Sequence, residues 1–201
     1  MKTILDLSGQ NPDVDWDQIK QIQGLEGVVL KVSEGITVQD KMFGTRFRAA
    51  VGHGVPVKGL YLFYHPSDDP NRQAENYINW RKSVTADNTI PAIVDLEWDE
   101  NPQEWANVSE ADRYSVLKTL IARLEAEGYE VMIYTSHAFM TQYLPHADFL
   151  AIYNLWVAWY KAAPPLLPSP WNAWTWWQYS DSGNVAGIEG PVDISYVQSE
   201  S

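Results

Sequence analysis

The chain has 201 residues, a formal net charge of −12 and no cysteine. Its length and its 45% hydrophobic content fit one domain with a substantial core and exclude a disordered chain. The missing cysteines exclude disulfides, zinc thiolates and a thiol nucleophile, while the acidic charge argues against nucleic acid and anionic membranes as partners.

The first half of the chain alternates short apolar runs with helical patterns. We expect strands over residues 4–7, 28–32, 57–64 and 90–97. One helix is predicted at the capping box of Asp15 with Gln18, and another after Asp69. A third is predicted over residues 43–51, where apolar residues recur at helical spacing. Strands that alternate with helices in this way favour a parallel sheet.

The second half begins in the same way and then loses its helices. A helix capped by Ser109 and ended by Gly128 precedes a strand over residues 131–135 and a short helix near 137–144. Three further strands are expected over residues 155–160, 174–179 and 185–194, with a proline-rich loop at 162–170. The pattern predicts an α/β fold, an irregular TIM-like barrel of eight strands with about five helices, in a single domain over residues 1–201.

Two carboxylates follow the buried fourth strand. Asp95 and Glu97 are two residues apart, so alternation puts both on one side of the strand, with Cβ atoms roughly 6 to 7 Å apart. They come at the carboxyl end of the strand, where α/β barrels carry their active sites. Neighbouring acids do not both ionise freely, and a neutral acid beside a charged one is what glycosidic cleavage needs. A solvated strand end is the alternative interpretation.

Further acids are predicted near the same end of the barrel. Asp6 ends the first strand and Asp193 lies at the end of the last, and closure of a barrel would make these two strands neighbours. Glu34 follows the second strand and is interpreted as a loop or rim residue. The ten tryptophans and eleven tyrosines suit stacking on sugar faces as well as the core.

Eight short motifs in order resemble the family 25 glycoside hydrolases, lysozymes of the Chalaropsis type. The motifs are Asp-Leu-Ser at 6–8, Lys-Val-Ser-Glu-Gly at 31–35, Gly-Leu-Tyr-Leu-Phe at 59–63, Asp-Leu-Glu at 95–97, Ile-Tyr-Thr-Ser at 133–136, Leu-Trp-Val-Ala-Trp-Tyr at 155–160, Trp-Gln-Tyr-Ser at 177–180 and Gly-Pro-Val-Asp at 190–193. The resemblance implies a flattened barrel and cleavage of the β-1,4 bond between N-acetylmuramic acid and N-acetylglucosamine in bacterial peptidoglycan.

The resemblance also implies a role for each matched residue. Glu97 matches the general acid, Asp95 its partner, and Asp6 and Asp193 the flanking acids of the groove. Positions implied to contact the sugar are Tyr61, Tyr134, Trp156, Tyr160 and Gln178. Many members carry histidine where this chain has Leu62, and alternation turns that side chain away from Tyr61, so we expect a change in packing there.

We expect no cofactor and no metal, because the four histidines lack ligand spacing. The expected partner is the glycan strand of peptidoglycan, bound by a monomer with no separate wall-binding domain. The N-terminus lacks the hydrophobic region of a signal peptide. A phage endolysin, a delivered effector and a secreted enzyme without its signal all remain open. A chitinase-like glycosidase and a catalytically weak glycan- or wall-binding module are the alternative functions.

Overall fold

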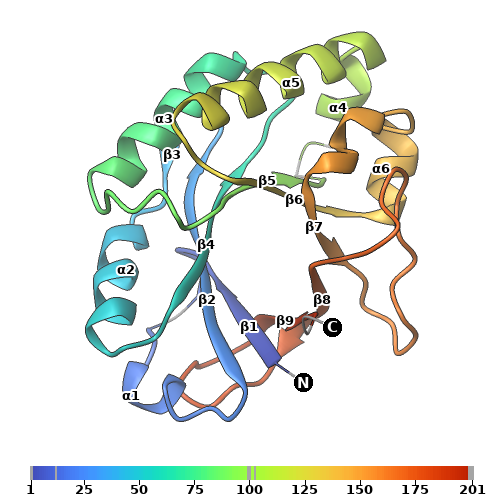
Figure 1. Ribbon diagram of the computed structural model, residues 1–201. Helices are drawn as coiled ribbons and strands as arrows, with labels where there is room; N and C mark the ends of the chain where they lie inside the picture. Colours follow the sequence, from blue (N-terminus) through green and yellow to red (C-terminus); the bar gives the residue numbers. More distant parts are fainter. Residues whose placement is uncertain (1, 12, 99–100, 102, 199–201) are drawn as a thin grey trace.

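The computed structural model describes residues 2–11, 13–98, 101 and 103–198, which form an α/β barrel (Figure 1). Its sheet runs in the order β1-β9-β8-β7-β6-β5-β4-β2-β3, and pairing of β1 with β2 closes eight of these strands into the predicted barrel. The strands are β1 (Lys2–Leu7), β2 (Leu25–Glu34), β3 (Val38–Gln39), β4 (Val57–Phe63), β5 (Ala92–Leu96), β6 (Val131–Ser136), β7 (Asn154–Ala158), β8 (Trp176–Gly183) and β9 (Val192–Val197).

Helices cover the outside of the barrel unevenly. Within the described ranges they are α1 (Trp16–Ile19), α2 (Phe43–Gly52), α3 (Pro70–Lys82), α4 (Gln103–Asn107), α5 (Glu110–Ala126), α6 (His137–Tyr143) and the 3₁₀ helix η1 (Asp148–Ile152). Figure 1 shows α2, α3 and α5 along one side, whereas β8 and β9 lack such a cover. The predicted caps form, since Asp69 and Ser109 accept from the backbone N–H groups of Arg72 and Asp112. The sequence predicted about five helices, and the additional one is α4, which was not predicted.

The chain has two hydrophobic layers, one on each side of the sheet. Inside the barrel lie Ile4, Val29, Tyr61, Ile93, Met132, Tyr134, Trp156, Ala158 and Trp176. The larger layer lies between the strands and the helices, and it contains the fully buried Leu62. Tyr61 and Leu62 therefore face opposite sides of β4, as predicted from alternation.

The last strand differs from its prediction in both position and direction. We expected residues 185–194, but β9 spans Val192–Val197 and runs antiparallel to both β1 and β8. The preceding glycines Gly187 and Gly190 have φ of 92° and 89°, so this segment turns. Asp193 thus begins its strand, and the antiparallel direction places this beginning beside the carboxyl end of β1.

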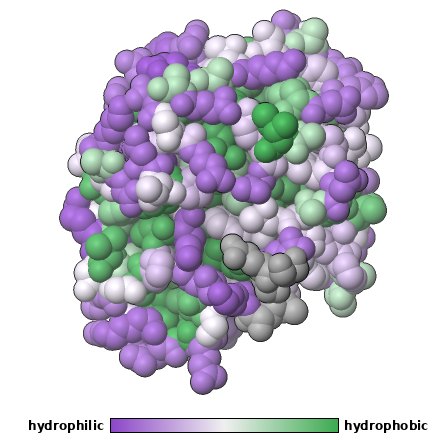
Figure 2. All heavy atoms as spheres, in the orientation of Figure 1, coloured by the Kyte–Doolittle hydropathy of each residue, from purple (hydrophilic) through white to green (hydrophobic). Residues whose placement is uncertain are grey.

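The face of the molecule seen in Figure 2 is largely polar. Figure 2 shows hydrophilic residues over much of the visible face, with smaller hydrophobic patches between them. None of the helices within the described ranges has the length and apolar character needed to cross a membrane.

Candidate active site

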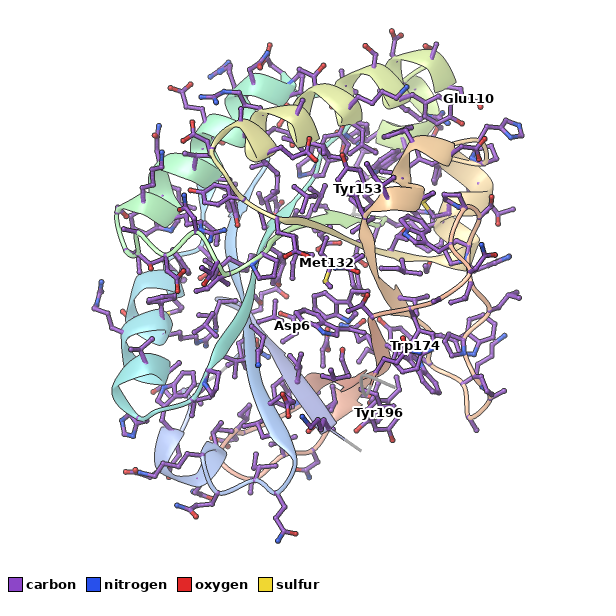
Figure 3. The ribbon with its side chains drawn as sticks, viewed as in Figure 1. Asp6, Glu110, Met132, Tyr153, Trp174 and Tyr196 are labelled. Carbon is purple, nitrogen blue, oxygen red and sulfur yellow. The ribbon has the colours of Figure 1, made fainter. Side chains whose placement is uncertain are left out.

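A cavity of about 220 Å³ opens at the carboxyl ends of the barrel strands. It continues into a second hollow of about 280 Å³ that shares Asp6, Tyr61 and Asp193 with it. The first cavity is lined by Asp6, Ser8, Gln10, Lys31, Tyr61, Phe63, Asp95, Glu97, Tyr134, Trp156 and Asp193. Together the two hollows form one trough, and Figure 3 shows Asp6 within the ring of strands that surrounds it.

The period of the strands explains why acids gather here. On β5 the inward side chain Ile93 is followed two residues later by Asp95 and then, just past the strand, by Glu97. On β1 the inward Ile4 is followed by Asp6, which pairs directly with Asp193 across the antiparallel ladder. The predicted convergence of the first, fourth and last barrel strands at one trough is therefore confirmed.

Burial and mutual repulsion raise the pKa of every acid in this cluster. Burial, followed by the charge of Asp193, raises the pKa of Glu97 to about 7, with Lys31 acting in the opposite direction. Burial and then Asp181 raise the pKa of Asp193 to about 6. Burial is also the main reason why the pKa of Asp6 and of Asp95 lies well above the ordinary range.

Two carboxylate oxygens in the trough are buried without a protein partner. Asp6 Oδ1 and Asp95 Oδ1 receive no hydrogen bond from the described residues. Buried acceptors of this kind are costly unless a donor reaches them, and the hydroxyl and amide groups of a sugar are such donors. The trough thus combines a carboxyl that keeps its proton near neutral pH with acceptors that fit a carbohydrate.

Aromatic side chains form the wall beside the acids. Tyr61, Tyr134 and Trp156 line the cavity, as expected for the matched positions. The rings of Tyr134 and Trp156 meet edge to face with centroids 4.7 Å apart, and Trp156 Nε1 donates to Ser195 Oγ at 2.9 Å. These contacts leave the rings little freedom, so their orientation is set before any ligand arrives.

Gln178 and Tyr160, the two other expected sugar contacts, do not line the cavity. Gln178 is almost fully buried, and its Oε1 accepts from the hydroxyls of Tyr134 and Tyr160, each at 2.6 Å. Its Nε2 donates to Asp193 Oδ2 at 3.1 Å. Gln178 therefore ties Tyr134 to Asp193 from behind the wall. Tyr160 is about half exposed at the rim, and its contact with a sugar stays a prediction.

Lys31 and Phe63 were not predicted as site residues, although both line the cavity. Strand alternation could have predicted Lys31 as a site residue, because it lies two residues after the inward-facing Val29 and so points to the same side. Glu34 lies outside this cavity, in a neighbouring hollow with His65 and Glu104, which agrees with its interpretation as a rim residue. The described residues contain no group of three or more histidines and carboxylates arranged to hold a metal ion.

A carboxyl with a raised pKa among other buried acids, in an aromatic-walled trough at the carboxyl end of an α/β barrel, is the arrangement that a glycoside hydrolase uses. The model of the glycosyl hydrolases family 25 matches residues 5–188, and the chain belongs to this family. The resemblance found in the eight motifs is thereby confirmed, as are the fold and the class of enzyme.

Named relatives are similar over nearly the whole chain. Lysozyme M1 of Streptomyces globisporus is 26% identical over 193 residues, which cover 94% of this chain and 65% of the relative. The N,O-diacetylmuramidase of Chalaropsis sp is 26% identical over 200 residues, covering 94% of each. The crystal structure of the bacterial lysozyme from Streptomyces coelicolor superposes with a TM-score of 0.88 at 25% identity, over 100% of this chain and 93% of that one. The chain thus spans about two thirds of lysozyme M1 and nearly all of the other two.

Proposed function

We propose that this chain is an N-acetylmuramidase that hydrolyses the β-1,4 bond between N-acetylmuramic acid and N-acetylglucosamine in peptidoglycan. The observation that carries the proposal is Glu97, a carboxyl with a pKa near 7 that lies in a trough with three other acids. Relatives named lysozyme M1 and N,O-diacetylmuramidase each match 94% of this chain.

Glu97 is the general acid in this proposal. A carboxyl that retains its proton close to neutral pH protonates the glycosidic oxygen as the bond to the anomeric carbon breaks. We propose that the carbonyl oxygen of the substrate's N-acetyl group bonds to the anomeric carbon, and that Asp95 orients this group and stabilises the developing positive charge. Water then attacks the anomeric carbon and the bond from that carbon to the N-acetyl oxygen breaks, while Glu97 takes a proton from the water. Two displacements at the same carbon leave the product with its original configuration.

Asp6 and Asp193 complete the polar floor of the trough, and the aromatic wall binds the sugar. Asp6 Oδ1 is a buried acceptor awaiting a donor, and Asp193 keeps the pKa of Glu97 high. Tyr61, Tyr134 and Trp156 present flat or hydroxyl-bearing surfaces to the cavity. A single barrel supplies all of these groups, which supports a catalyst that acts as a monomer.

The test of this proposal is the variant Glu97→Gln, which keeps the shape of the side chain and removes its proton. We expect clearing of purified peptidoglycan to fall by at least about 10²- to 10⁴-fold, the usual contribution of a general acid or base. Glu75→Gln, on the exposed surface of α3, is the matched control and should clear at the wild-type rate. Wild-type clearing by Glu97→Gln would refute the assignment.

The products distinguish this function from the two alternatives. A muramidase should release muropeptides from cell walls and no product from chitin. This result would exclude a chitinase-like enzyme. Binding to walls without release of product would instead identify a glycan-binding module. NMR of the first anomer released from a soluble fragment should show the β form, and an initial α product would overturn net retention.

A further inference from the structure

A row of alternating charges leads from helix α4 to the trough. His65 Nδ1 lies 2.7 Å from Glu104 Oε2, and His65 Nε2 lies 3.4 Å from Glu34 Oε1. Glu34 Oε2 in turn lies 2.7 Å from Lys31 Nζ. Lys31 is the last member of the row and lines the same cavity as Asp95 and Glu97. We call these four residues the charge row.

An irregularity in β2 brings Lys31 and Glu34 together. Residues three apart on a regular strand point to opposite faces, so these two side chains would not meet. The pairing of β2 with β4 shifts its register between Lys31 and Ser33, which adds one residue to β2 at this point. Such a bulge re-aims the side chains that follow it. Glu34 consequently turns to the side of Lys31 and pairs with it.

The far end of the charge row is held firmly by the fold. Gln73, fully buried in α3, accepts from the backbone N–H of His65 at 3.0 Å and donates to its carbonyl at 2.8 Å. Ser67 Oγ donates to Glu104 Oε1 at 2.6 Å. His65 has two carboxylate partners, which raise its pKa to about 9, so it carries a positive charge at neutral pH. Glu34 is thus fixed between two cations.

Lys31 is the cation of the trough. Of the described residues that line its two hollows, Lys31 alone is basic. Its side chain is only 16% exposed, and within the described ranges its ion-pair contact is with Glu34 rather than with any acid of the trough. The titratable groups that face it are Asp6 on β1, Glu34 on β2, Tyr61 on β4, Asp95 and Glu97 at the end of β5, Tyr134 on β6 and Asp193 on β9.

We propose that Lys31 is a positioning residue for the reaction, tethered by Glu34 and His65 so that its ammonium stays beside the acids of the trough without pairing with any of them. The inference rests on the proposed function, because it assigns the group that limits how far burial raises the pKa of the reacting carboxyls. The tether matters since a free ammonium among four acids would move onto them and fill the space of the sugar. In agreement, the charge of Lys31 lowers the pKa of Asp6, of Asp95 and of Glu97, against the larger effect of burial.

The experiment is the dependence of kcat/KM on pH, measured on a soluble peptidoglycan fragment. Lys31→Met removes the positive charge, so both limbs of the profile should move to higher pH by roughly half a unit or more, the size expected for the loss of one charge from the same cavity. Lys31→Arg keeps the charge and is the matched control, with both limbs near their wild-type positions. An unshifted profile for Lys31→Met, or equal shifts for the two variants, would overturn the proposal.

Glu34→Gln tests the tether and predicts the opposite direction. This variant removes a negative charge near Asp95 and releases the ammonium toward the acids, so the limbs should move to lower pH while KM rises. A shift to higher pH, or an unchanged KM, would contradict a tether. The Glu97→Gln variant tests the proposed function independently. If the charge-row proposal is wrong, Glu97→Gln still loses activity while the Lys31 and Glu34 variants keep the wild-type pH profile. If the proposed function is wrong, Glu97→Gln keeps its activity.

Discussion

Two groups of carboxylates lie side by side at the rim of this barrel, yet their protons behave in opposite ways. In the trough, the pKa of Glu97 rises to about 7 and that of Asp193 to about 6. In the charge row next to it, the pKa of Glu34 falls to about 2 and that of Glu104 is also lowered. Burial raises the pKa in all four cases, so burial alone does not explain the difference.

The difference lies in the partners that the fold supplies. Glu34 has His65 and Lys31 within ion-pair distance, and Glu104 has His65 and the hydroxyl of Ser67. The acids of the trough instead face one another, with a single basic neighbour among the lining residues that the structure describes. A cluster of acids becomes proton-donating when it has few cationic partners. Lys31, the basic residue that lines the trough, forms its ion pair with Glu34 of the charge row.

Asp95→Asn should give the largest effect, because it replaces the buried carboxyl beside Glu97 with an amide. We expect kcat to fall by about 10²- to 10³-fold, the usual loss for one preorganised electrostatic contact. Initial rates on a soluble wall fragment give the value, with circular dichroism to verify folding. Asp112→Asn, at an exposed helix start, is the matched control. A loss of less than threefold would remove Asp95 from the reaction.

Asp193→Asn should have a smaller effect on activity than Asp95→Asn. The charge of Asp193 helps to raise the pKa of Glu97, so its removal lowers that pKa. Glu97 must be protonated to act as the acid, and the alkaline limb of kcat/KM should therefore move to lower pH. Activity at pH 5 should change much less than activity at pH 8. An alkaline limb that stays in place would show that Asp193 does not act on Glu97.

His65→Gln should act mainly on stability, and this effect is the smallest. The folded-state pKa of His65 is raised from 6.5 to about 9, so protonated His65 stabilises the fold. This contribution is fully present below the unfolded pKa of 6.5 and is lost as pH rises through about 9. The Tm difference between wild type and variant should be largest below pH 6.5 and vanish above pH 9.

Exposed His146→Gln, which removes a histidine from another part of the surface, is the control variant for this stability series. A pH-independent Tm difference for His65→Gln would mean that His65 contributes only packing. The charge of His65 would then not explain the lowered pKa of Glu34 and Glu104.

Local patterns predicted most of the barrel and most of the trough. Alternation placed Asp95 and Glu97 on one side of β5, and side-chain caps marked the starts of α3 and α5. These features depend on residues close together in sequence. Asp6 and Asp193 needed one long-range assumption, closure of the barrel, and the β1–β9 pairing satisfies it.

The unpredicted features depend on contacts between distant segments. The direction of β9 follows from turns at Gly187 and Gly190 and from pairing with β1, neither of which has a periodic signature. Helix α4 has five residues, too few to show a helical period. The pairing of Lys31 with Glu34 requires a bulge whose position is set by β4, so simple alternation places these side chains apart.

The most direct test of the account is titration of the Glu97 carboxyl itself. Carbon-13 NMR of protein labelled at glutamate, with the signal assigned by its absence in Glu97→Gln, follows this group through the pH range. The account predicts a midpoint near pH 7 for Glu97, while Glu34 in the same spectra titrates near pH 2. A Glu97 midpoint at the ordinary value of 4.5 would contradict a proton-donating glutamate in this trough.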